Sequence, residues 1–214
     1  MKMTWPWLML VGLGAFHGLN PAMGWLFAVA RGLQTGSRAV VLQSMLPIAA
    51  GHALSIGIIV AAVALLRPWL DIRALQAGCA VVLIGYGAYR MLARHRARVG
   101  MKVGAIQLAL WSFLMATADG AGLMLVPALL AIPLDGSSAG RGHMAAMDVM
   151  PASTTTGLAA VGIHTIAMLA MATTVALLVY EWVGLAFLRR GWINFELLWA
   201  TALIGTGGIL LLVA

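Results

Sequence analysis

The sequence predicts an all-α integral membrane protein, with one transmembrane domain over residues 1–214 in which six helices form an inverted repeat of three plus three. Three observations favour this fold class: an apolar composition, apolar segments of bilayer length, and short matches between the two halves, about 1–100 and 101–214. Apolar residues make up 63% of the 214 residues and charged residues 9%. The mean hydropathy is +1.00. These values lie outside the range of soluble domains.

Six segments are long enough to cross a bilayer as helices, which takes about 20 mostly apolar residues. They are Trp5–Arg31, Ala39–Leu66, Ala74–Leu92, Gly104–Ala131, Thr156–Trp182 and Ile193–Leu212. The first apolar run follows Lys2 as in a signal peptide, but it continues past Pro21 without a small-residue cleavage site. We therefore expect it to remain as the first helix.

The basic residues predict the orientation of the chain in the membrane. Nine lie in the loops after the first, third and fifth helices: Arg31, Arg38, Arg90, Arg94, Arg96, Arg98, Lys102, Arg189 and Arg190. Four lie on the opposite side: Lys2, Arg67, Arg73 and Arg141. The positive-inside rule then predicts a multi-pass protein of a bacterial-type inner membrane with both termini outside. The run Arg94–Arg98 is interpreted as a topology anchor beside anionic lipid, so no nucleic-acid partner is expected.

Helices one and four are expected to be broken. Pro21 lacks a backbone N–H and its ring clashes with a preceding carbonyl, so a helix through this segment is interrupted near Leu19 and Asn20. The fourth helix contains a second polar segment, Thr117–Met124. Interrupted helices are tolerated inside a membrane where protein or a wet cavity surrounds them, and transporters build binding sites there.

Short matches relate the two halves of the chain. In the first half, His52 lies eleven residues before the segment Val63–Leu66, and in the second half His164 lies eleven residues before the matching segment Val175–Leu178. Leu83–Gly87 matches Leu203–Gly207 in the same way. Because each half has three helices, the copies enter the membrane from opposite sides, which predicts an inverted repeat with a site at its interface. On this alignment Asp119 lies opposite His17.

The repeat would bring together five polar residues, which we interpret as a site for substrate or a coupling ion: His17, Asn20, His52, Asp119 and His164. Histidine titrates near neutral pH, and a carboxylate inside a span costs a few kcal/mol unless it is paired, wet or protonated. Proton coupling through these residues is one interpretation. Binding of a divalent metal as substrate, by His17, His52, Asp119 and His164, is the other. No other cofactor is expected.

Two further features have structural interpretations. The single cysteine, Cys79, excludes an intramolecular disulfide and is interpreted as a packing residue. In the segment Asp135–Ala152, His143 and Met147 are four residues apart and would face together on a helix. That segment is either an interfacial helix or a soft-metal site, for example for Cu(I).

The first half resembles the LysE-type exporter superfamily. The resemblance rests on the broken first helix, the segment Gly32–Arg38, Gly51-His52 in the second helix, and Gly85–Arg90 before an arginine-rich loop. It implies a six-helix inner-membrane protein with a three-plus-three repeat that expels amino acids, metals or other small solutes.

The same stretch is similar in part to the nickel/cobalt exporter branch, whose motif reads His-Ala-x-Glu-Pro-Gly-His. His17 and Pro21 match it in spacing, whereas Asn20 stands at the acid and Met23 at the second histidine.

Together these features predict a secondary transporter that exports a small solute, not an enzyme, with a small-molecule or ion substrate, the bilayer and a possible homodimer as partners. A transition-metal exporter or a metal-binding membrane protein is an alternative. From another class, an integral-membrane enzyme would use buried His and Asp for acid–base chemistry, although HExxH and a cysteine pair are missing from the sequence. A non-transporting membrane subunit is a further alternative.

Overall fold

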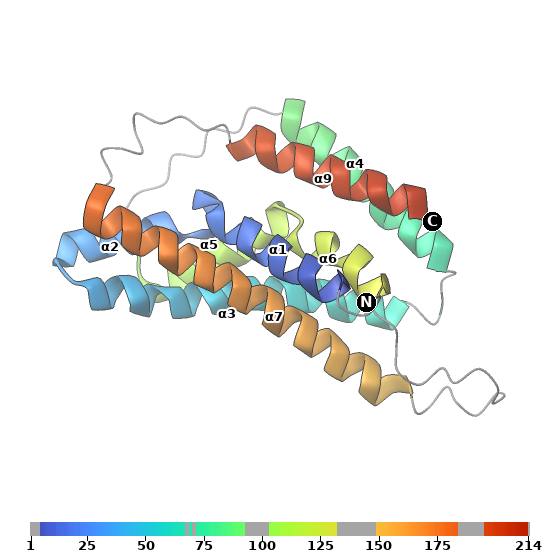
Figure 1. The fold of residues 1–214 in the computed structure, drawn as a ribbon, viewed down its shortest axis with the longest axis horizontal. Coiled ribbons are helices and arrows are strands. Elements are labelled where there is room, and N and C mark those ends of the chain that lie inside the picture. The colour runs from blue at the N-terminus through green and yellow to red at the C-terminus, as the bar shows by residue number, and fades with distance from the viewer. Residues whose placement is uncertain are drawn as a thin grey trace.

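The computed structural model describes residues 5–66, 69, 72–92, 103–131, 149–183 and 195–213. Regular structure in these residues is helical, without a strand, so the all-α prediction is confirmed for them. The elements are α1 (Trp5–Leu19), η1 (Pro21–Met23), α2 (Trp25–Thr35), α3 (Arg38–Leu66), α4 (Ile72–Leu92), α5 (Ala105–Ala118), α6 (Ala121–Ala131), α7 (Val149–Leu178), the π-helical turn η2 (Val179–Val183) and α9 (Phe195–Val213) (Figure 1).

Both expected helix interruptions are present. α1 ends at Leu19, and η1 separates it from α2. α5 ends at Ala118, and Asp119 and Gly120 form a turn before α6 begins at Ala121. Gly24 (φ 115°) and Gly120 (φ 67°) have backbone conformations that favour glycine, so each break has a glycine suited to the turn.

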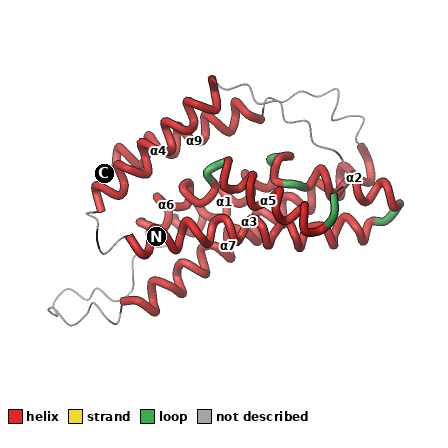
Figure 2. Tube along the Cα trace, turned by 180° about the vertical axis from the view of Figure 1, so that it is seen from behind, coloured by secondary structure: helices red, strands yellow, loops and turns green. Residues whose placement is uncertain are grey.

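Successive passes of the chain run in alternate directions between two ends of the molecule (Figure 1). α1 begins and α9 ends at one of these ends, and the turn between α2 and α3 lies at the other. α1 packs along α7, and α3 packs along α5. α4 and α9 lie side by side along one edge, as the views from both sides show (Figure 2).

The contact between α4 and α9 is reciprocal. A Cβ built on Gly87 would lie 3.0 Å from the Ala200 carbonyl oxygen, and one built on Gly207 would lie 2.9 Å from the Ala80 carbonyl oxygen. Gly87 and Gly207 are the last glycines of the two matching Leu-Ile-Gly-x-Gly motifs. The last glycine of each motif therefore makes the same close contact with the backbone of the opposite helix.

Two helical segments among the described residues are long and apolar enough to cross a membrane, Arg38–Val63 and Thr155–Trp182. Three shorter apolar helices lie in Trp5–Leu19, Ala105–Ala118 and Ala200–Leu212. Two of these, in α1 and α5, are short because they end at the interruptions.

Two basic residues that were counted with the loops for the orientation of the chain belong to helices. Arg31 lies inside α2 and Arg90 inside α4, as the predicted segments Trp5–Arg31 and Ala74–Leu92 allow. A long arginine stem can pack along a helix end while its head reaches water or a carboxylate, which hydropathy alone does not reveal. The sequence-predicted pair of His143 and Met147 lies outside the described residues.

Candidate functional site

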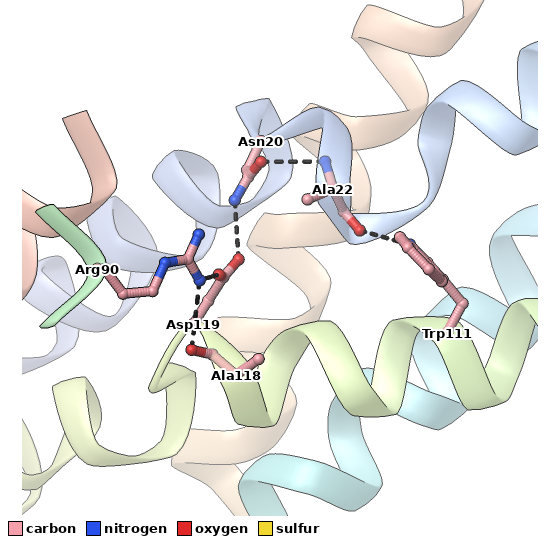
Figure 3. Close-up of polar contacts among 6 residues, drawn as sticks. All are labelled: Asn20, Ala22, Arg90, Trp111, Ala118 and Asp119. Atoms are coloured by element: carbon pink, nitrogen blue, oxygen red, sulfur yellow. Dashed lines mark hydrogen bonds and ion pairs between the residues drawn. The ribbon is translucent and has the colours of Figure 1, made fainter. Parts of the chain in front are cut away.

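The two helix interruptions meet at Asp119. This residue is 1% exposed, and its Oδ2 accepts a hydrogen bond of 2.9 Å from Asn20 Nδ2 (Figure 3). Its Oδ1 accepts a hydrogen bond of 2.5 Å from Nη1 of Arg90, which also donates to the Ala118 carbonyl oxygen at 3.4 Å. The carboxylate therefore has both a charged and a neutral partner, as a buried carboxylate requires.

Local backbone chemistry explains the position of Asn20. Its Oδ1 accepts a hydrogen bond from the Ala22 backbone N–H at 3.0 Å, so it caps η1. The same side chain is left with its NH₂ group directed at Asp119 (Figure 3). Trp111 of α5 donates from Nε1 to the Ala22 carbonyl oxygen at 2.8 Å. These bonds hold the break after α1 directly against the broken α5–α6 helix.

Three histidines form a second polar group, one on each of α1, α3 and α7. The His17, His52 and His164 side chains are fully buried. The ring centroids are 5.7 Å apart for His17 and His52, 5.0 Å for His17 and His164, and 5.5 Å for His52 and His164. His17 Nδ1 lies 2.8 Å from the Leu13 carbonyl oxygen, and His164 Nδ1 lies 3.2 Å from that of Leu10.

Several buried polar atoms in this histidine cluster and at the neighbouring Thr165 lack a hydrogen-bond partner among the described residues. Within the described part of the chain, both nitrogens of His52, Nε2 of His164 and the hydroxyl of Thr165 are buried without a hydrogen bond. A buried polar group left in this condition costs about 1–3 kcal/mol. The cluster therefore has hydrogen-bonding capacity that the described residues do not use.

All five site residues predicted from the sequence are buried. The structure joins Asn20 to Asp119 and joins His17 to His52 and His164. The two groups adjoin along the chain, because the Asn20 N–H donates to the His17 carbonyl oxygen at 3.1 Å. By position at the helix break, Asn20 rather than His17 corresponds to Asp119.

Arg90 is the site residue that sequence reasoning missed. Its guanidinium forms the ion pair with Asp119 and is 17% exposed. The sequence contained a signal for this residue. An acid inside a membrane span requires a counter-ion, and Arg90 follows the tyrosines near the end of the third apolar segment.

The metal interpretation stays a prediction from the sequence. No group of three or more His, Cys, Asp or Glu residues in the described ranges is arranged so that it could hold a metal ion.

No protein-family model, curated protein sequence or solved structure matches this chain. The function is therefore argued from the residues and their geometry.

Proposed function

We propose that this chain is a secondary transporter of a bacterial-type inner membrane that exports a small solute and couples its movement to protons. In this proposal six passes form an inverted repeat with both termini outside. The observation that carries it is the buried contact between Asn20, Asp119 and Arg90, formed where the two interrupted helices meet. Interrupted helices that meet around buried polar groups are a recurrent construction of transport sites.

The outer faces of the helices support the membrane placement. Along α5, Ile106, Leu110 and Leu114 are 56–78% exposed, whereas Leu108 and Ser112 on the opposite face are fully buried. The exposed leucine or isoleucine recurs every four residues, so one whole stripe of the helix is apolar. Large exposed side chains also occur on α3 and α7, among them Leu46 at 73% and Ile166 at 68%. Water-soluble monomers rarely expose contiguous apolar surfaces of this kind, whereas lipid favours them.

The helix packing supports the inverted repeat. The first helix of each half packs on the second helix of the other half: α1 on α7, and α5 on α3. The third helices, α4 and α9, pack on each other through Gly87 and Gly207. A twofold relation between the halves produces this set of contacts, and transporters with such repeats place their sites between the halves.

The ion pair gives the proposal its chemistry. Arg90 belongs to α4, in the edge pair of helices, and Asp119 lies in the turn between α5 and α6. Protonation of Asp119 would remove the charge that attracts Arg90 and so loosen the edge pair from the helix break. Proton binding would in this way favour one arrangement of the helices over another.

Purified protein in proteoliposomes containing a pH-sensitive dye tests the proposal. The panel consists of amino acids and, for the metal alternative, Ni²⁺, Co²⁺ and Zn²⁺, added one at a time against an imposed pH gradient. We expect one solute class to cause proton movement in the wild type and in Glu181→Gln, the matched control, whose carboxylate forms an exposed pair with Arg38. Asp119→Asn, which keeps an oxygen for Asn20 but loses the charge, should abolish this movement.

Equal proton movement in the wild type and Asp119→Asn would contradict the role given to the carboxylate. A change in assembly, with no solute-dependent flux in any variant, would instead favour the non-transporting subunit.

A further inference from the structure

A recess separate from the helix breaks lies beside the turn between α2 and α3. Its volume is about 450 Å³, and its lining residues are Arg31, Gln34, Thr35, Val40, Val103 and Gly104. They come from the last turns of α2, the first turn of α3 and the segment that leads into α5. The α2–α3 turn lies at the end of the molecule opposite the start of α1 (Figure 1). This end also carries Arg38, the first residue of α3.

Arg31 supplies the positive charge of the recess. Its Nη1 donates to Ser44 Oγ at 3.1 Å, and Ser44 in turn donates to the Val40 carbonyl oxygen at 2.7 Å. This chain of bonds fixes the guanidinium at the wall of the recess. The ion pairs among the described residues are Arg38 with Glu181 and Arg90 with Asp119, so Arg31 has no carboxylate partner there. A guanidinium has five N–H donors, so Arg31 keeps donors for a ligand.

The backbone around Arg31 adds to the positive potential. Val40 lies in the first turn of α3, and Gly104 is the N-cap of α5, so two helix N-termini border the recess. The C-terminus of α2 opposes them, but its Gly32 carbonyl oxygen already accepts from the N–H groups of Gly36 and Ser37. Each helix terminus carries about half a unit charge, positive at an N-terminus and negative at a C-terminus. The two N-termini, the C-terminus of α2 and the unit charge of Arg31 together give the recess a net charge of about +1.5.

We propose that this recess binds a phosphate group, supplied either by the headgroup of an anionic phospholipid or by a free phosphate. Arginine forms charge-assisted, paired hydrogen bonds with phosphate oxygens, which suits a guanidinium fixed on one side of an open recess. On the orientation proposed above, the recess lies at the cytoplasmic end of the helices, where basic pockets bind anionic headgroups. The proposal requires the membrane placement but not transport, so the two can fail independently.

Thermal unfolding of the detergent-solubilised protein tests this proposal. Phosphatidylglycerol, phosphatidylcholine and inorganic phosphate are titrated separately at constant ionic strength. The variants are Arg31→Gln and the matched control Arg38→Gln, which removes a cation at the same end whose side chain is 60% exposed. We expect saturable stabilisation by phosphatidylglycerol but not by phosphatidylcholine. The apparent Kd should rise about tenfold or more in Arg31→Gln and stay within about twofold in Arg38→Gln.

A second variant protects the test against misfolding of Arg31→Gln. Thr35 lies at the exposed rim of the recess, so Thr35→Trp should fill the recess without changing charge, and it should weaken binding to a similar extent. Stabilisation by inorganic phosphate alone, with the same pattern among variants, would identify a free phosphate as the ligand. Equal loss in Arg31→Gln and Arg38→Gln would indicate diffuse surface charge and overturn the proposal, as would the absence of stabilisation by any anion.

Discussion

Replacing Arg90 with glutamine should destabilise the protein far more than replacing Arg38 with glutamine. Arg90 and Asp119 are 17% and 1% exposed, whereas Arg38 and Glu181 are 60% and 37% exposed. Removing one member of a buried pair leaves an uncompensated charge, which costs about 3–5 kcal/mol. An exposed pair contributes at most about 1 kcal/mol.

The expected shift in the melting temperature follows from these free energies. For a chain of this size, 1 kcal/mol corresponds to about 2–4 °C. Arg90→Gln should therefore lower the Tm by about 6 °C or more, and Arg38→Gln by at most about 4 °C. Cys79 provides the assay, because it is the only cysteine and is 8% exposed, so a thiol-reactive fluorogenic dye labels it on unfolding.

The double variant Arg90→Gln/Asp119→Asn decides whether the charge is the cause. It leaves neutral hydrogen-bonding groups at both positions, so it should recover at least half of the Tm lost in Arg90→Gln. Additive losses from the two single substitutions would refute the reasoning, since uncoupled residues behave in that way. A Tm for Arg90→Gln equal to that of Arg38→Gln would refute it too.

Three further predictions concern backbone contacts and the histidine cluster. Gly51→Ala should prevent stable folding, because the new Cβ would lie 2.0 Å from the Ala109 carbonyl oxygen. Gly57→Ala is the control and should be tolerated, because no atom lies within 4 Å of the new Cβ. The measurement is the yield of monodisperse protein for each variant. Gly120→Ala should cost about 1–2 kcal/mol, read from the Tm, because its φ is 67°. His52→Phe keeps an aromatic ring and removes two buried nitrogens without partners in the described structure, so its Tm should not fall while solute-dependent proton movement is lost. A lower Tm would contradict the expected gain from removing these nitrogens.

The positions of the helix breaks could be predicted because their causes are local. Pro21 lacks an N–H wherever the rest of the chain lies, and Asp119-Gly120 is good turn chemistry by itself. Local causes were less informative at the helix start expected at Thr156, since α7 begins at Val149. Pro151 lies in the first turn of α7, where proline is tolerated, so it does not mark a boundary.

The register between the halves could not be predicted from short matches. His52 and His164 are 112 residues apart, whereas the Leu-Ile-Gly motifs at Leu83 and Leu203 are 120 apart. Asn20 and Asp119, which end the first helix of each half, are 99 residues apart. In the proposed repeat, loops of different length change the offset from one helix to the next, so the pairing of His17 with Asp119 did not follow. Arg90 was missed for a related reason, because its partner lies in the turn after another helix, 29 residues away.

The polar groups at the breaks are difficult to explain by stability. Buried ion pairs are often replaced by apolar residues of similar volume with no loss of stability. Nitrogens such as those of His52, which have no partner among the described residues, lower stability. A helix bundle that served only as a scaffold would gain stability from leucine at these positions. Asn20 and Asp119 instead lie at the two breaks, where backbone groups are already released from helical hydrogen bonding. A polar solute binds most readily where side-chain and backbone groups are both available, so the cost in stability is consistent with a site that must bind and release its ligand.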